Sequence, residues 1–389
     1  MSIRVSQPAI NLREKLIETT TPPIGAHGSE LMDSSSVGES FDLVKAGRKN
    51  MIINGDMQIA QRATTASGFN GSPNWVFSTV DRWKLGMSGA GTWTSSQDTD
   101  VPIGQGFTKS WKLDCTTADA AVDSGDYFLL EQKIEANRMA ELCWGTARAK
   151  PVTLSFWVKS SVTGDCNGML YCPGFNTLRI VNQNFTIHNA NEWEFKTMTF
   201  PAHGPENSFT INNAAGARLW IWFKAGSQWT AGSGTRNYWR NNAHNQQAPG
   251  TTINIASSTS NNLWITGVQF EVGYNATPFE FKSYADQLYD CMRYYEGIKM
   301  GIGTALFRTW TNTAGSPTNV SNVEYNFKVE KRVSPTWAVE GNASWHPSGT
   351  SGMSAYPSTS TCLFQRNDTT HQFLSDTSGD LCGSFSAEL

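Results

Sequence analysis

Two glutamates, Glu131 and Glu135, are the best local pair of side chains that could act together on a glycosidic bond. Glycoside hydrolysis needs two carboxyl groups held about 5 to 9.5 Å apart across the scissile bond. Residues spaced i and i+4 are neighbours on a helix, where such a pair more often belongs to a solvated face. Asp81 in the segment VDRW is followed by Arg82 and is typical of a structural ion pair or a turn cap. These carboxylates give little support for catalysis.

Motifs of other enzyme classes are absent from the sequence. It contains no GxSxG, no HExxH, no phosphate-binding loop and no cluster of Cys and His. The six His are isolated, without the spacing to another His or a Cys that a zinc site requires. The sequence therefore predicts a protein that is not an enzyme and has no cofactor and no metal.

Three tryptophans have the pattern expected of a binding surface. In the alternating segments 154–159 and 219–224, the aliphatic residues share one face, which suits a hydrophobic core. The opposite faces carry Trp157, or Trp220 and Trp222, each together with a lysine. A flat aromatic ring complements the C–H face of a sugar, so we predict that these three residues bind carbohydrate. The alternative is that a helix, a loop or a neighbouring subunit covers them, because large aromatics are rarely left exposed without a partner.

Composition limits the class of protein. The 389 residues favour two or three domains, and only 16% are charged, with a formal net charge of −3. No basic surface for nucleic acid is expected. Fifteen Trp and 34 Gly, with many small polar residues, indicate an all-β protein with long loops. The sequence has no apolar run of membrane-spanning length, and its start has no apolar segment typical of a secretory signal.

The seven cysteines are odd in number and scattered, and no pair forms CxxC. With no secretory signal expected, we predict free buried thiols. A disulfide between Cys166 and Cys172 across a hairpin loop is the alternative.

Residues 1–50 differ in character from the rest of the chain. Apolar residues recur between polar ones with the loose spacing of a short amphipathic helix, and Pro22 and Pro23 follow. The segment is too small to have its own core. It is either a disordered tail or an adaptor that orders against a larger assembly, and the persisting apolar residues favour the adaptor. These residues are Val5, Ile10, Leu12, Leu16 and Ile17.

Residues 51–283 contain many short alternating stretches separated by turn residues, which indicates an antiparallel sandwich or jelly roll. Residues 263–272 are predicted to be its last strand, with Trp264, Thr266, Val268 and Phe270 on one face. Residues 51–59 are predicted to be its first strand, paired with the last. The other expected strands are 110–115, 127–130, 152–159, 193–200 and 218–224, with a short one possible at 252–256.

Two helices are expected, at 134–143 and at 284–296, and the second leaves the sandwich as a connector. Short strands at 321–329, 336–339, 362–364 and 381–385 form the C-terminal part. The predicted domains are an arm at 1–50, a jelly roll at 51–283, a connector helix at 284–297 and a small β domain at 298–389.

Several segments together resemble bacteriophage virion fibre proteins. They occur in the same order as in that family and cover about residues 47–297. The segments are RKNMIINGDMQIAQR, VDRW, VTLSFWVKSS and WITGVQFEVGYNATPFEFKSYADQLYDCMRYYE, followed by FKVEKRVSPT and the final SAEL. The resemblance implies a jelly roll similar to carbohydrate-binding modules and an N-terminal arm that attaches the chain to the virion. It further implies a trimer exposed on the particle, with tail, portal-vertex or capsid proteins as partners.

One feature of similar jelly rolls does not transfer to this sequence. They often hold a structural calcium ion between acidic residues of the opening turn and of the last strand. Gln58 and Gly267 occupy those places here, whereas Asp56 and Glu271 are nearby but out of step. No calcium site is therefore predicted.

The resulting hypothesis is a structural fibre component that touches host-surface glycans. The alternatives are a capsid- or tail-decorating protein without glycan binding and a glycan-cleaving enzyme. No nucleic acid and no membrane insertion are expected.

Overall fold

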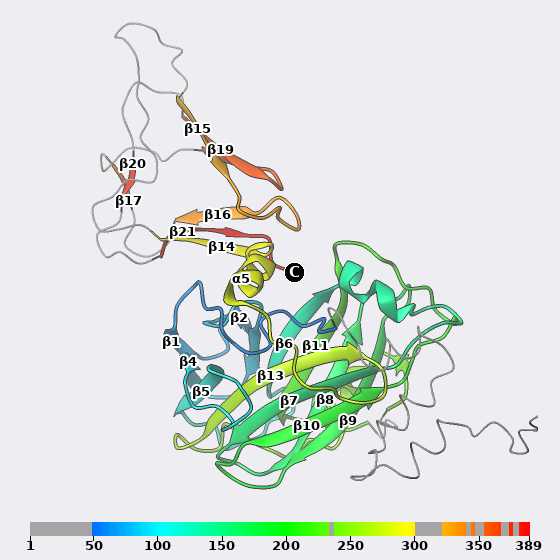
Figure 1. The fold of residues 1–389 in the computed structure, drawn as a ribbon. Coiled ribbons are helices and arrows are strands. Elements are labelled where there is room, and N and C mark those ends of the chain that lie inside the picture. The colour runs from blue at the N-terminus through cyan, green and yellow to red at the C-terminus, as the bar shows by residue number, and fades with distance from the viewer. Residues whose placement is uncertain are drawn as a thin grey trace, which may run out of the picture. The chain divides into compact units, whose positions relative to one another are not determined.

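A computed structural model describes residues 49–232, 237–299, 321–339, 344–346, 354–366, 373–375 and 381–389 (Figure 1). The chain divides into two compact units, Met1–Lys49 and Asn50–Leu389. The predicted attachment residues of the arm lie outside the described residues. The described part is an all-β fold built from antiparallel sheets, as the sequence predicts.

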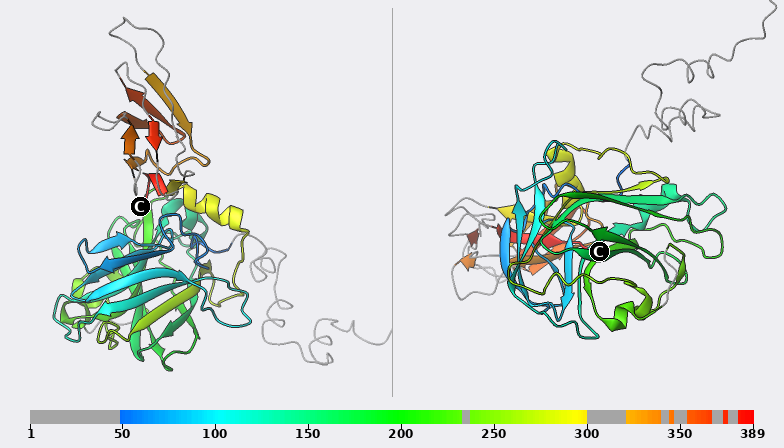
Figure 2. Two further views of the ribbon diagram at one scale, coloured as in Figure 1. Left: turned by 90° about the vertical axis from the view of Figure 1, so that its left-hand side faces the viewer. Right: turned by 90° about the horizontal axis from the view of Figure 1, so that it is seen from below.

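The sandwich consists of a six-stranded and a seven-stranded sheet (Figure 2). In the six-stranded sheet the strands lie in the order β1 (Thr65–Phe69), β4 (Thr92–Asp98), β5 (Ser110–Thr117), β13 (Asn262–Val272), β7 (Val152–Ser160) and β10 (Glu194–Phe200). In the seven-stranded sheet the order is β12 (Arg240–Asn241), β9 (Arg179–Ile187), β8 (Gly164–Cys172), β11 (Ala215–Ala225), β6 (Tyr127–Glu135), β3 (Lys84–Ser88) and β2 (Trp75–Phe77).

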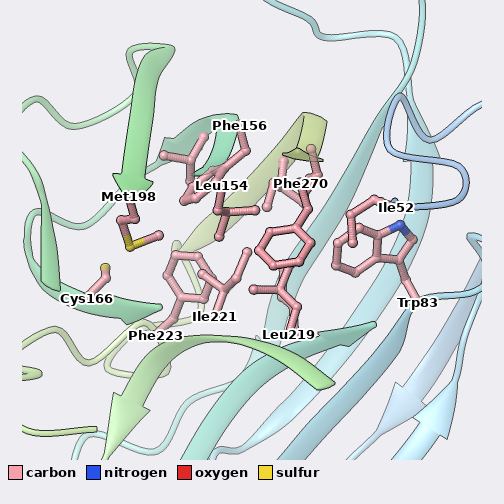
Figure 3. Packing of buried hydrophobic residues seen from close by; sticks show 14 of the residues in the cluster. Ile52, Trp83, Leu154, Phe156, Cys166, Met198, Leu219, Ile221, Phe223 and Phe270 are labelled. Atoms are coloured by element: carbon pink, nitrogen blue, oxygen red, sulfur yellow. The ribbon is translucent and has the colours of Figure 1, made fainter. Parts of the chain in front are cut away.

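The hydrophobic core lies between the two sheets (Figure 3). The predicted core faces of β7 and β11 are confirmed, because their aliphatic and phenyl side chains are buried in one cluster. Full burial of one such side chain contributes about 1.5–3 kcal/mol. The residues concerned are Leu154, Phe156 and Val158 of β7 and Leu219, Ile221 and Phe223 of β11.

The central strand β13 does not keep the predicted alternation. Its pairing with β7 shifts by a residue between Thr266 and Gln269, and Gly267 there has φ of +64°. This bulge moves the core-facing side chains from Leu263 and Ile265 to Val268 and Phe270. The prediction that Trp264, Thr266, Val268 and Phe270 share a face is therefore wrong.

The opening segment at 51–59 lies beside β13 but is not a strand. The Val268 amide donates to the Gly55 carbonyl at 2.9 Å, and the Met51 amide donates to Phe270 at 2.9 Å. Asn54 and Met57 have φ near +60°, which interrupts an extended backbone. The Asn54 amide group instead binds both Ile59 N and Ile59 O, so the segment turns back on itself.

The helices differ in their limits from the predicted ones. At 134–143 the strand β6 continues to Glu135 and a 3-10 helix, η1 (Ala136–Leu142), follows. The connector helix is α5 (Tyr284–Met292), which the Ser283 side chain caps by accepting from the Asp286 amide. It ends before Glu296, which belongs to the next strand. Two short elements, α4 (Ser227–Thr230) and η2 (His244–Gln246), lie in the long loop before β13.

The sequence analysis missed the strands β8 and β9, and also the shorter strands β1 to β4 and β12. Cys166 and Cys172 both lie on β8 and are free thiols, so the alternative of a disulfide across a hairpin loop is wrong. Cys115, Cys291 and Cys362 are also free and buried, as predicted, whereas Cys143 is free but only half-buried. The possible strand at 252–256 is not formed. The amides of Thr252 and Ile253 both donate to the Asp165 carbonyl of β8, and the Ile255 amide donates to Phe223 of β11.

After α5 the chain forms smaller antiparallel sheets. One sheet contains β14 (Tyr295–Lys299), β21 (Leu381–Ser386) and β16 (Thr336–Val339). Another contains β15 (Ser321–Asn326), β19 (Thr361–Arg366) and β18 (Ser354–Pro357). A third pairs β17 (Ser344–His346) with β20 (Phe373–Ser375). Phe385 packs against Phe327 and Trp337 with ring centroids 4.7 and 4.8 Å apart. Beside them the buried ammonium of Lys331 pairs with Glu296 at 2.5 Å.

The bulge at Gly267 makes a first prediction about stability. A Cβ atom at this residue would lie 2.5 Å from the Phe107 ring, in addition to the cost of φ at +64°. We expect Gly267→Ala to lower the free energy of unfolding by about 2–3 kcal/mol, measured by urea denaturation. Gly104 also has positive φ, but a Cβ there meets nothing within 4 Å. Gly104→Ala therefore isolates the backbone strain, and equal losses in the two variants would contradict the role assigned to the close contact.

Candidate functional site

The two tryptophans of β11 lie on the outer face of the seven-stranded sheet. Trp220 and Trp222 alternate with the core residues Leu219 and Ile221, and their ring centroids are 5.9 Å apart. They belong to an aromatic cluster separate from the core. We call this cluster the aromatic face, and its rings are those of Trp75, Tyr127, Tyr171, Trp220, Trp222 and Trp229.

Trp157, the third predicted binding residue, is not part of this face. It lies on β7 in the other sheet, where its ring is 5.3 Å from that of Phe195. Lys159 lies two residues further along β7, and its ammonium pairs with Asp100 at 2.7 Å. The structure therefore brings together two of the three tryptophans and places the third on the outside of the opposite sheet.

The lysine expected beside Trp220 and Trp222 also lies elsewhere. The pairing of β11 with β6 shifts between Trp222 and Lys224, which ends the alternation that the sequence suggests. The Lys224 side chain is fully buried, and its ammonium donates to the Gly89 carbonyl at 2.6 Å and lies 3.1 Å from Asp126. The Lys224 ammonium therefore interacts with Gly89 and Asp126 inside the sandwich and does not lie beside Trp220 and Trp222.

Two further rings lie on either side of Trp220. The Tyr171 ring of β8 stacks on it at 5.0 Å with an interplanar angle of 23°, and the Trp75 ring of β2 lies at 5.6 Å. Trp75 covers Gly86, where a Cβ atom would lie only 2.6 Å from the indole ring. Trp75 and Tyr171 are both partly exposed, whereas Trp220 between them is 7% exposed. Trp75 and Tyr171 are therefore the accessible rings on either side of the buried Trp220.

The other end of the aromatic face is covered. Trp222 is 1% exposed, and the ring of Trp229 from α4 lies 5.7 Å from it. His244 from η2 packs on Trp229 at 5.4 Å. The long loop before β13 thus buries Trp222, whereas Trp75 and Tyr171 stay accessible. The alternative that a loop covers the predicted binding tryptophans therefore holds for Trp222 and for only part of the face.

The two candidate catalytic glutamates are occupied by structural contacts. Glu131 accepts a hydrogen bond from Trp220 Nε1 at 2.6 Å. Glu135 accepts from Arg293 at 2.8 Å and from the Tyr294 hydroxyl at 2.7 Å. Burial alone would raise the pKa of Glu135, but the hydrogen bonds from Arg293 and Tyr294 outweigh it and lower this pKa. Both carboxylates are about 2% exposed on a strand, so the predicted solvated helix face is wrong.

Asp81 and Arg82 of the VDRW segment lie in a buried charge cluster. Asp81 accepts from the Gln61 backbone amide at 3.0 Å and lies 3.6 Å from Arg62, which agrees with the structural interpretation of this residue. Burial raises the pKa of Asp81 to about 6, against the opposing charge of Arg62. Arg62 and Arg82 also both pair with Glu388, so the cluster joins the opening of the sandwich to the last described residues.

Three cations lie around the Trp220–Glu131 contact, and we call them the cationic rim: Lys84, Lys133 and Arg218. In the sheet register Lys84 is opposite Glu131, and Arg218 is opposite Lys133. The Arg218 guanidinium lies 5.2 Å from the centre of the Tyr171 ring. Lys84, Lys133 and Glu131 line a small hollow together with Phe77, Arg82 and Leu389. The accessible rings therefore have positive charge beside them.

Lys133 of the cationic rim has a lowered pKa, and burial is its main cause. Burial lowers the pKa of Lys133 to about 8, and the charges of Lys84 and Arg218 act in the same direction, although Glu131 opposes them. Lys133 donates to the Leu389 carbonyl oxygen at 2.6 Å.

The two acidic residues near the expected calcium position, Asp56 and Glu271, bind amide and hydroxyl groups. Asp56 accepts from Gln58 at 2.9 Å and from Gln287 at 2.7 Å. Glu271 accepts from the backbone amide and the hydroxyl of Thr277, both at 2.7 Å. Among the residues that the structure describes, no group of three or more His, Cys, Asp or Glu side chains is placed to hold a metal ion.

The sequence analysis missed Trp75 and Tyr171, for different reasons. Trp75-Val76-Phe77 is a short aromatic stretch that could have been recognised as an edge strand. Tyr171 lies in Gly164–Cys172, where glycines, asparagine and aspartate lower the β-propensity, so the strand is not evident from the sequence.

No helix within the described ranges is long and apolar enough to cross a membrane.

Comparisons with known proteins give structural likenesses at low scores. No protein-family model matches the chain, and no curated protein matches it. A solved enzymatically active domain of tailspike protein 4 from bacteriophage CBA120 is 13% identical, with a TM-score of 0.31 over 58% of this chain and 21% of that one. A putative sugar-binding protein from Bacteroides thetaiotaomicron is 10% identical, with a TM-score of 0.30 over 58% and 100% of the two chains. A carbohydrate-binding module described as CBM4 is 15% identical, with a TM-score of 0.26 over 57% and 98%. Similarity at this level assigns neither a ligand nor a function to this chain.

The lowered pKa of Lys133 predicts a pH dependence of stability. The pKa of this residue is about 8 in the folded protein, compared with 10.5 for an ordinary lysine. Between these pH values the unfolded chain binds more protons, so Lys133 makes the free energy of unfolding rise with pH. The expected result is that wild type gains stability relative to Lys133→Met as the pH is raised from about 8 to 10.5. Urea denaturation across this range measures the difference, and parallel curves for the two proteins would contradict the prediction.

Proposed function

We propose that this chain is a non-enzymatic structural fibre component of a phage particle and that its aromatic face contacts host-surface glycans. The glycan part of the proposal depends on one observation: Trp75 and Tyr171 remain partly exposed on either side of Trp220 on the outer face of one sheet. The phage part depends on the ordered segments that resemble virion fibre proteins, from RKNMIINGD to RYYE.

The physical case for glycans is the combination of flat rings with nearby polar groups. Indole and phenol rings offer apolar surfaces that complement the C–H faces of sugar rings, and they are largely fixed before binding. Neighbouring charged side chains can donate hydrogen bonds to hydroxyl groups and set the orientation of a ligand. Glu131 accepts a hydrogen bond from the Trp220 indole, so the orientation of the central ring is fixed before a ligand arrives.

Hydrolysis of a bound glycan is not part of the proposal. A glycosidase needs one carboxyl group that can donate a proton and another that can act as nucleophile or base. Glu131 and Glu135 are buried and hydrogen-bonded, and the hydrogen bonds from Arg293 and Tyr294 hold the pKa of Glu135 low. We expect no release of reducing sugars from polysaccharides incubated with the protein.

The arm and the oligomeric state complete the proposal. Residues 1–50 would anchor the chain to tail, portal-vertex or capsid proteins, with Val5, Ile10 and Leu12 among the apolar contacts. A homotrimer, which is common among the fibre proteins that this chain resembles, would repeat that contact around an axis. The β domains would then be exposed on the particle.

Removal of an accessible ring should weaken glycan binding. We expect Trp75→Ala and Tyr171→Ala each to lower the affinity for a bound glycan about tenfold or more, since each removes a stacking surface. A glycan array identifies the ligand, and titration calorimetry measures the affinity. Trp157→Ala, on the opposite sheet, is the matched control and should leave the affinity unchanged. Wild-type protein that binds no glycan would favour a decorating protein with purely structural contacts.

Deletion of residues 1–45 tests the attachment role of the arm. Because the compact unit begins at Asn50, we expect the truncated protein to keep the circular-dichroism melt of the full chain. Incorporation into particles should be lost, since the apolar positions of the arm are gone. Truncated chain that is still present at normal copy number in purified particles would place the attachment site in the β domains instead.

A further inference from the structure

Three positively charged side chains and one glutamate lie beside the accessible rings. Lys84, Lys133 and Arg218 lie on β3, β6 and β11 at neighbouring positions of the outer face, with Glu131 among them. Lys133 lies directly opposite Arg218 and diagonal to Lys84, whereas Lys84 and Arg218 lie on strands on either side of β6, roughly 10 Å apart across the sheet. Their long side chains allow both cations to reach one ligand of sugar size over β6. The positive charge is local, because the whole chain has a formal net charge of −3.

The acidic group in this patch, Glu131, is already hydrogen-bonded to Trp220. Glu131 is 2% exposed and accepts from Trp220 Nε1, so little of its charge faces solvent. Lys133 donates to the carbonyl oxygen of Leu389. Among the described side chains, no carboxylate lies within ion-pair distance of Lys84 or Arg218. These two partly exposed cations lie over or beside aromatic rings, Lys84 at 4.5 Å from Phe77 and Arg218 at 5.2 Å from Tyr171.

We propose that the aromatic face selects acidic glycans, with Lys84 and Arg218 binding an anionic substituent of a sugar that stacks on Trp75 and Tyr171. This inference rests on the proposed glycan-binding function and adds the chemical class of the ligand. A guanidinium can bind a carboxylate or a sulfate or phosphate ester through two parallel hydrogen bonds. Burial is the main cause that lowers the pKa of Lys133, and the charges of Lys84 and Arg218 act in the same direction, so an anion bound here would reduce repulsion between the cations.

The test compares glycans that differ only in charge. The probes are polygalacturonate with its methyl ester, hyaluronan with its methyl ester, and dextran sulfate with dextran, printed beside a broad glycan array. We expect the acidic member of at least one pair, or the acidic glycans of the array as a group, to bind about tenfold more tightly than the neutral counterpart. The preference should shrink as sodium chloride is raised from about 0.05 to 0.5 M, because partly exposed charges are screened. Binding to the uronate pairs or to dextran sulfate distinguishes a carboxylate from a sulfate ligand.

The matched variants separate this inference from general electrostatic attraction. The double variant Lys84→Gln/Arg218→Gln should lose the preference for the acidic member and keep its affinity for the neutral one. Lys112→Gln removes a partly exposed lysine from the outer face of the other sheet and should change neither affinity. Near-ultraviolet circular dichroism verifies that each variant is folded.

The possible failures are distinguishable. Equal binding within every pair, with loss of all binding in Trp75→Ala, overturns the acidic preference and leaves the glycan site intact. An acidic preference that survives in the Lys84→Gln/Arg218→Gln variant overturns the assignment of these two residues. Wild-type protein that binds no glycan of either charge overturns the proposed function and this inference together.

Discussion

The one-residue shift of register at Gly267 is the constraint on which the sandwich depends. The strand β13 lies between β5 and β7 and must present apolar side chains to the core along its whole length. Before the bulge these are Leu263 and Ile265, and after it they are Val268 and Phe270. The backbone at Gly267 has φ of +64° and the Phe107 ring close by, a combination that only glycine accepts without strain. The opening segment, through Gly55 and Met51, is in turn hydrogen-bonded to the strand after the bulge.

Buried charges connect parts of the chain that are far apart in sequence. Arg62 and Arg82 pair with Glu388 while their guanidinium groups lie 3.6 Å from the ring centres of Tyr295 and Tyr294. An isolated charge in such a place would be costly, and the network of opposite charges, amide donors and aromatic faces offsets that cost. This network holds the segments VDRW, RYYE and SAEL together, although they are far apart in the sequence.

The outer face of the seven-stranded sheet shows how one strand can have two roles. Phe223 and Ile221 of β11 fill the core, whereas Trp220 is fixed on the opposite side by Glu131 and flanked by Tyr171. At Trp222 the loop that contains α4 and η2 closes over the sheet. The rings of Trp75 and Tyr171 and the cationic rim thus lie together at one end of the face.

The sequence by itself determined the fold class, the core faces of β7 and β11 and the connector helix. Strand alternation and helical periodicity are local properties, and each needs only a few consecutive residues. It also placed Trp220 and Trp222 on one face, because their spacing lies within a single strand. Only the tertiary structure decided that Trp157 belongs to the opposite sheet, that Glu131 and Glu135 are buried on a strand, and that Trp75 and Tyr171 flank Trp220. Those relations depend on which strands pair and on bulges at Gly267 and after Trp222, and a one-residue shift of register reverses the face of every later side chain in a strand.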